Sequence, residues 1–225
     1  MSSPSFRFGD FPPSEHRSIH VIASNLAEID RFLDDFESAL ALFDHCEIWI
    51  PGAKDNEIAF ELCMSWRTIA ARDGAMSIYH MGKIMDAIRG GFKDCPTFRS
   101  NVDTNALKAA IKRMEAEFPI YIKMRHAVSH RGELHSTPEK RQINSVSGSV
   151  NLPGIKISPD SSNNTLRGLI NRTLFDSFEG SVISYEISQE AFHELREIRN
   201  EFMQAFSKVH EGWRPLLRSG RSYRQ

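Results

Sequence analysis

The sequence lacks the cysteine patterns that stabilise small secreted domains or bind zinc. Its three cysteines, Cys46, Cys63 and Cys95, are far apart, odd in number and without any C-x-x-C spacing. This usage argues against a disulfide framework and against a cysteine-based zinc site. A reducing cytoplasm fits the chain best.

Long apolar runs are also missing. No stretch approaches the roughly 20 apolar residues that cross a membrane. Residues 1–15 contain neither the basic segment nor the apolar segment of a secretory signal. We therefore expect a cytoplasmic protein without membrane association, with a loose N-terminal leader over residues 1–23.

The chain has no overall excess of charge of one sign. Its 28 Lys and Arg nearly balance 29 Asp and Glu, for a formal net charge of −1. There is no global attraction to nucleic acid, so any RNA contact must come from a local patch. The C-terminal segment 212–225 is locally basic and has no acidic residue, which we interpret as a solubilising tail.

What is present is the composition of an ordinary globular protein. Hydrophobic residues make up 40% and charged residues 25% of 225 residues, which excludes the disordered and membrane classes. A chain of this length can bury a core without disulfides or metal. We predict one domain over residues 24–211.

Helical periodicity predicts two long helices in the first half of the chain. The first follows Ser24 and Asn25, with Glu28 completing a capping box, and its apolar residues recur as far as Phe43. Residues 46–53 are predicted to be a connection. The second helix is predicted over residues 56–89, ending at Gly90-Gly91.

Two more helices are predicted in the second half. One begins at Asp103 as N-cap and continues through Val128, with a kink at Pro119. The other follows Ser188 and stops before Gly212. Four such helices predict a mainly α fold, a four-helix up-and-down bundle.

The second helix has an unusual apolar stripe, which we predict to face the core. An acid and an imidazole interrupt it, and Gly74 beside them could permit a close approach. The stripe residues are Leu62, Trp66, Ile69, Asp73, Met76, His80, Ile84 and Ala87.

Residues 136–187 differ in character from the helical segments. Ser, Asn, Gly and Pro are frequent there, and short β-prone runs appear at 143–150, 172–175 and 182–187. We predict a β-hairpin-rich insertion before the last helix, with a hairpin connection at 176–181 and a loop at 158–165.

The sequence Arg125-His126-Ala127-Val128-Ser129-His130 gathers a permanent cation and two imidazoles at the end of the third helix. A guanidinium can hold two phosphate oxygens, and histidine can transfer a proton near neutral pH. These residues therefore suit phosphate chemistry.

Two other interpretations of the cluster remain open. His126 and His130 share a helix face, so they could bind a metal ion with His135 as third ligand, although the HExxH form is absent. Alternatively, Arg125 could be buried and neutralised by Asp73, with His80 joining the network. In that case Asp73 and His80 could also support a site built on Arg125.

The Arg125, His126 and His130 pattern at the end of the third predicted helix resembles the HEPN superfamily of four-helix-bundle proteins. That family's signature is an arginine, a polar residue, three further residues and a histidine. The resemblance covers residues 24–135 and 188–210, and it leaves the insertion without a counterpart.

The resemblance implies a metal-independent RNase that needs no cofactor, commonly a homodimer, of the kind found in toxin–antitoxin systems. It implies that Arg125 holds the scissile phosphate, that His130 is general acid or base, and that His126 orients the phosphate or ribose. The implied partners are single-stranded RNA, a second copy and an antitoxin or other protein. The alternative is a non-catalytic bundle that binds a protein or a nucleotide.

Overall fold

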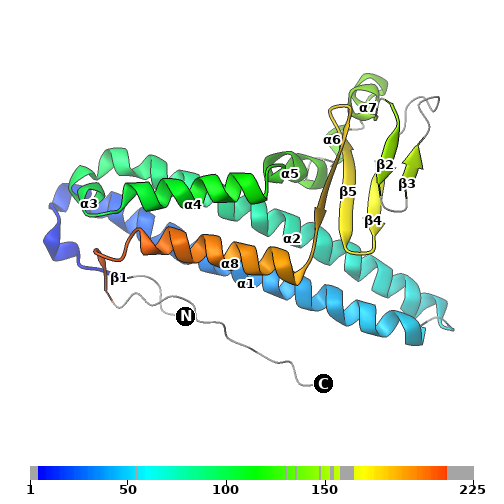
Figure 1. The fold of residues 1–225 in the computed structure, drawn as a ribbon, viewed down its shortest axis with the longest axis horizontal. Coiled ribbons are helices and arrows are strands. Elements are labelled where there is room, and N and C mark those ends of the chain that lie inside the picture. Colours follow the sequence, from blue (N-terminus) through cyan, green and yellow to red (C-terminus); the bar gives the residue numbers. More distant parts are fainter. Residues whose placement is uncertain are drawn as a thin grey trace. The chain divides into compact units, whose positions relative to one another are not determined.

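The computed structural model describes residues 5–53, 55–129, 131–134, 136–146, 148–152, 155–157 and 165–211. The protein is mainly helical, with a small three-stranded antiparallel sheet. The helices labelled in Figure 1 and their neighbours are α1 (His16–Ala53), α2 (Glu57–Gly91), α3 (Pro96–Ser100), α4 (Thr104–Glu117), α5 (Tyr121–Ser129), α6 (Arg131–Leu134), α7 (Pro138–Asn144) and α8 (Gln189–Gln204). The strands are β1 (Ser5–Phe6), β2 (Val150–Leu152), β3 (Ile155–Ile157), β4 (Arg167–Ile170), β5 (Thr173–Phe178), β6 (Ser181–Glu186) and β7 (His210–Glu211).

The chain divides into two compact units. The first unit comprises residues 1–31, 81–117 and 193–225, and the second comprises residues 32–80 and 118–192. Helices α1, α2 and α8 contribute residues to both units. Each unit has its own buried apolar residues.

The first unit has a core rich in phenylalanine. The ring of Phe98, fully buried in α3, lies 5.0 Å from Phe6, 5.2 Å from Phe11 and 6.4 Å from Phe206 between centroids. The Glu15 carboxylate accepts hydrogen bonds from the backbone N–H groups of Thr97 and Phe98, both at 3.0 Å. These contacts fix the start of α3, where Pro96 cannot donate a backbone hydrogen bond.

Arginines connect helices within the first unit. Arg113 of α4 pairs with Glu194 of α8 at 2.5 Å and also with Glu201. Arg199 of α8, which is buried, pairs with Asp30 of α1 at 2.7 Å. Buried guanidinium groups need such partners, because an unpaired buried charge is costly.

The second unit contains the sheet, in the order β4-β5-β6. Both tight connections use left-handed backbone: Asn171 has φ 50° between β4 and β5, and Glu179 and Gly180 have φ 49° and 76° between β5 and β6. Two consecutive residues with positive φ are the mark of a type I′ hairpin turn. Strands β2 and β3 form a separate antiparallel pair.

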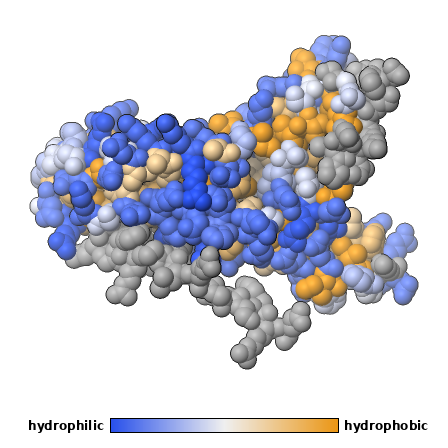
Figure 2. Space-filling view, viewed as in Figure 1, coloured by the Kyte–Doolittle hydropathy of each residue, from blue (hydrophilic) through white to orange (hydrophobic). Residues whose placement is uncertain are grey.

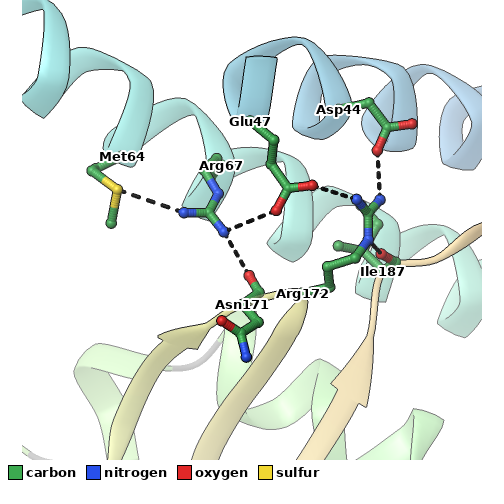
Figure 3. A network of polar contacts seen from close by, with 7 residues as sticks. All are labelled: Asp44, Glu47, Met64, Arg67, Asn171, Arg172 and Ile187. Carbon is green, nitrogen blue, oxygen red and sulfur yellow. Dashed lines mark hydrogen bonds and ion pairs between the residues drawn. The ribbon is translucent and has the colours of Figure 1, made fainter. Parts of the chain in front are cut away.

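A network of arginines fastens the sheet to α1 and α2 (Figure 3). Arg172, the residue just before β5, pairs with Asp44 and Glu47 of α1, both at 2.6 Å. Arg67 of α2 donates to the Asn171 carbonyl at 2.7 Å and pairs with Glu47 at 3.4 Å. Both guanidinium groups lie over the ring of Phe43, 4.8 Å (Arg67) and 4.9 Å (Arg172) from its centroid.

Close approach of β6 to α2 explains a glycine. Tyr185 of β6 donates a hydrogen bond to the Ala71 carbonyl at 2.7 Å. A Cβ at Gly74, one turn further along α2, would lie 2.5 Å from the Tyr185 hydroxyl oxygen. The nearest neighbour at Gly74 is thus a strand of the insertion, and the ring of Phe36 of α1 would lie 3.4 Å from the same Cβ.

The N-terminal half of the chain is more helical than the sequence predicted. Helix α1 begins at His16, after a short 3₁₀ turn at Pro13–Glu15, so residues 16–23 belong to the helix and not to a loose leader. It also continues through residues 46–53, with Pro51 inside its last turn. The expected capping box at Asn25 is therefore an interior helical position.

Some of the other predicted helix ends agree with the structure, and others differ from it. Helix α2 ends at Gly91, and Asp103 caps α4 by accepting from the backbone N–H of Asn105 and Ala106, as predicted. Pro119 separates α4 from α5 instead of kinking one helix. Helix α8 follows Ser188, whose hydroxyl accepts from the Ala191 N–H, but it ends at Gln204.

The strands expected at 172–175 and 182–187 overlap β5 and β6. Of the described residues in the run 143–150, Ile143 and Asn144 end α7, and Val150 begins β2. The start of α7 has its own local signal, because Thr137 caps the helix and Pro138 occupies its first turn. The expected connection at 176–181 is mostly strand, with its turn at Glu179 and Gly180. Most of the expected loop at 158–165 and the tail 212–225 lie outside the described residues.

In the part of the chain that the structure describes, no helix has both the length and the apolar character needed to span a membrane. All three cysteines are buried and free of disulfides.

Candidate functional site

Helix α5 presents the Arg-His pair in the second unit. It starts just after Pro119, where the Tyr121 N–H bonds to the Phe118 carbonyl and the Met124 N–H bonds to the Ile120 carbonyl. Met124 and Val128 turn inward and are buried, while Arg125 and His126 are half-buried. The pair therefore lies at the border between core and solvent, where a side chain is both positioned and accessible.

Arg125 is positioned by an aromatic ring and not by a carboxylate. Its guanidinium carbon lies 5.2 Å from the centroid of the Tyr79 ring of α2. It forms no hydrogen bond or ion pair with any described residue. A cation–π contact leaves all the guanidinium N–H donors available, and these are the groups that bind phosphate oxygens.

The ion pair between Arg125 and Asp73 that the sequence allowed is absent. Asp73 is exposed on α2, and its carboxylate forms no ion pair with a described residue. Partial burial, and next the nearby Asp35 carboxylate, raise the pKa of Asp73. Asp73 thus lies among groups that disfavour its charge, and it does not neutralise the motif arginine.

His80 and Arg125 contact the same aromatic ring, that of Tyr79. The His80 ring stacks on Phe32 of α1, with centroids 5.2 Å apart and planes at 20°, and meets the edge of Tyr79 at 5.2 Å. The ring of Tyr121 of α5 lies 6.4 Å from Tyr79. Tyr79 therefore links His80 to Arg125, although nothing in the periodicity distinguished this tyrosine.

Of the histidines in and beside the motif, the structure describes His126 and leaves His130 and His135 outside the described residues. His126 stacks on Phe178 of β5, with centroids 5.9 Å apart and planes at 16°. His130 and His135 lie outside the described residues, so the structure does not place the predicted general acid or base. Among the residues it does describe, no three His, Cys, Asp or Glu side chains are grouped as metal ligands.

Two arginines hold the C-terminal end of α5. Arg167 of β4 donates to the Ala127 carbonyl at 3.0 Å, and Arg72 of α2 donates to the Val128 carbonyl at 3.3 Å. Asp176 of β5, with only 6% of its side chain exposed, pairs with Arg167 at 2.7 Å. Cations suit a helix C-terminus, because the last carbonyls have no intrahelical partner and carry partial negative charge.

A small cavity lies beside this helix end. It has a volume of about 50 Å³ and is lined by Thr68, Arg72, Met124, Val128, Arg167, Gly168, Leu174 and Asp176. The Nε of Arg72 is buried without a hydrogen-bond partner. The sequence offered no signal for Arg167 or Asp176, since their pairing depends on strand register across the insertion.

The arrangement brings together a guanidinium that pairs with none of the described carboxylates, a stacked imidazole and an aromatic group. They lie at the end of a helix that neighbouring arginines hold in place. Such a surface can bind an anionic oxygen at Arg125 and a planar ring beside it. No protein-family model, curated protein or solved structure matches this chain significantly.

Proposed function

We propose that this chain is a metal-independent endoribonuclease of HEPN type. In this proposal α1, α2, the α4–α5 pair and α8 correspond to the four helices of the HEPN bundle. The strands between α7 and α8 are an insertion into it. Single-stranded RNA is the substrate.

The availability of Arg125 carries the proposal. Arg113, Arg167, Arg172 and Arg199 are each held by a carboxylate. Arg125 instead lies on Tyr79 with its donors unused by any described residue. A half-buried arginine kept free of carboxylates favours an anionic ligand over a structural role.

In the proposed reaction Arg125 holds the scissile phosphate and offsets the charge that develops on its oxygens. His130 takes the proton from the ribose 2′-hydroxyl as that oxygen attacks phosphorus. The bond to the 5′-oxygen breaks, and the leaving oxygen receives a proton. The products are a 2′,3′-cyclic phosphate and a 5′-hydroxyl, with His126 orienting the phosphate or the ribose.

Cleavage of mixed-sequence single-stranded RNA in excess EDTA tests this proposal. Wild type is compared with Arg125→Ala and His130→Ala, and with Lys140→Ala, which changes an exposed cation of α7, as the matched control. We expect cleavage by wild type and by the control, with cyclic-phosphate ends, and a loss of at least about 100-fold in the two motif variants.

Equal cleavage by all four proteins, or cleavage by none of them, would contradict the proposed nuclease activity. The second candidate would then be a non-catalytic binding module. One observation favours it independently: α2 exposes several large apolar side chains, including Ile58 and Ile69. An exposed apolar face is typical of an interaction surface.

A further inference from the structure

Helix α2 turns part of its predicted core stripe toward solvent. In the second unit Ile58, Leu62, Trp66 and Ile69 are 79%, 46%, 38% and 55% exposed. They recur at spacings of four, four and three residues, so they lie on one side of the helix. We call these four residues the α2 stripe.

The opposite side of α2 already supplies its core contacts. Ala71, Gly74 and Ile78 are buried, and Gly74 and Ala71 receive Tyr185 of the sheet. The helix is therefore apolar on two sides, of which only one is covered. Figure 2 shows hydrophobic side chains at the surface where α1 ends and α2 begins, at the lower right of the view.

An open groove extends the stripe at the N-terminal end of α2. It has a volume of about 450 Å³ and is lined by Ile48, Trp49, Gly52, Ala53, Asn56 and Ala59. Ile48 and Trp49 of α1 are themselves 70% and 60% exposed. Stripe and groove together offer both a raised surface and a hollow to a partner.

The exposed area is the size that a stable dimer needs. With roughly 150–250 Å² for each large apolar residue, the four stripe residues and the two α1 residues expose on the order of 600 Å². Monomeric proteins rarely leave so much contiguous apolar surface in water. A standard interface buries about 800 Å² per partner, so this apolar surface is close to that size.

The charges along α2 favour a second copy of the chain in antiparallel orientation as the partner. Asp55, Glu57 and Glu61 are exposed at the N-terminal end of the stripe, and no described basic residue from 55 to 61 accompanies them. Arg72 lies just beyond the other end. Antiparallel pairing of two identical stripes sets acidic ends against arginine-bearing ends, whereas parallel pairing sets acid against acid.

We propose that the α2 stripe is an isologous dimer interface, in which a second copy of the chain packs its own α2 stripe in antiparallel orientation. The two-fold axis passes midway between Ile58 and Ile69, close to Leu62, so that Asp55 of one copy faces Arg72 of the other. Each copy inserts Trp66 and Leu62 against the partner's stripe. This inference does not depend on RNA cleavage.

Sedimentation velocity of the full chain over a wide concentration range tests the interface. Wild type should be dimeric, and Leu62→Glu and Trp66→Glu should each weaken dimerisation by roughly 30-fold or more, the effect of a central hot spot. Ile143→Glu is the matched control, because Ile143 of α7 is 62% exposed in the same unit but off the stripe, and it should remain dimeric. Unchanged thermal melting shows that each variant is folded.

Cysteine cross-linking tests the orientation. The native cysteines are buried, so a Leu62→Cys variant should form a disulfide-linked dimer on oxidation. Ile58→Cys should not, because two copies of residue 58 in antiparallel helices are about 17 Å apart along the helix axis. A monomeric wild type, or stripe variants that dimerise as the control does, would overturn the interface. Equal cross-linking at both positions would overturn the antiparallel arrangement.

Discussion

Arg125 lies over the ring of Tyr79, 5.2 Å from its centroid, and has no carboxylate partner among the described residues. The ring holds the guanidinium in place and leaves its hydrogen-bond donors unused. This relationship distinguishes Arg125 from the arginines that connect helices and strands elsewhere in the chain.

Replacement of Tyr79 should weaken RNA binding without unfolding the protein. Tyr79→Leu removes the cation–π contact and frees the guanidinium to move, so we expect affinity for single-stranded RNA to fall about two- to fivefold. Tyr79→Phe keeps the ring and should bind as wild type does. Fluorescence anisotropy with a labelled RNA measures both, and equal losses in the two variants would assign the effect to the hydroxyl group instead.

Loss of Arg167 should destabilise the second unit. Arg167→Gln removes the hydrogen bond to the Ala127 carbonyl and the ion pair with the buried Asp176 carboxylate. We expect a cost of about 2 kcal/mol in the free energy of unfolding. Urea denaturation checks this value. Adding Asp176→Asn should recover part of the loss, and strict additivity of the two changes would contradict the pairing.

A methyl group at Gly74 should collide with Tyr185. The Cβ of Gly74→Ala would lie 2.5 Å from the Tyr185 hydroxyl oxygen, so β6 or α2 must shift, at a cost of about 1–3 kcal/mol. Tyr185→Phe removes that oxygen and its bond to Ala71, and should cost about 1 kcal/mol. The double variant should be more stable than the sum predicts, as measured by a denaturation cycle.

Glu15 should make stability depend on pH in the acid range. Burial raises the pKa of Glu15, but hydrogen bonds from the backbone of Phe98 and Thr97 outweigh it and lower the pKa below 4.5. A carboxylate of this kind stabilises the fold above pH 4.5, and the contribution is lost as the pH falls through the folded pKa. Glu15→Gln should therefore be less stable at neutral pH.

The matching measurement is the urea midpoint of both proteins across the acid range. The curves of wild type and Glu15→Gln should converge as the pH falls below 4.5. A constant gap between them at every pH would show that the carboxylate charge is not what fixes the start of α3.

Local signals predicted several element ends because those signals act through nearby atoms. Asp103 caps α4 and Ser188 caps α8, each through a hydrogen bond to a residue three positions further along the chain. The glycine pair ended α2 as expected. The start of α1 was placed too late, because Ser24 and Asn25 look like a cap but lie inside a helix that buries Ile19 and Ile22 as well.

The sequence could not show which side of α2 is covered. Periodicity places Leu62, Trp66 and Ile69 on one face, but small residues such as Ala71 and Gly74 form the side that packs, since the sheet approaches too closely for larger ones. The partners of the motif helix were equally hidden. Arg167 donates a hydrogen bond to the Ala127 carbonyl from β4, and the pairing of β4 with β5 that positions Arg167 is not encoded in any local pattern.

The end of α5 is tied to two different elements, to β4 through Arg167 and to α2 through Arg72. The last turn of the motif helix thus cannot move independently of either. A ligand or partner that displaced β4 would pull on the Ala127 carbonyl and re-aim the residues beyond it. The strands that look like an appendage to a helical protein are in this way mechanically coupled to its Arg-His motif.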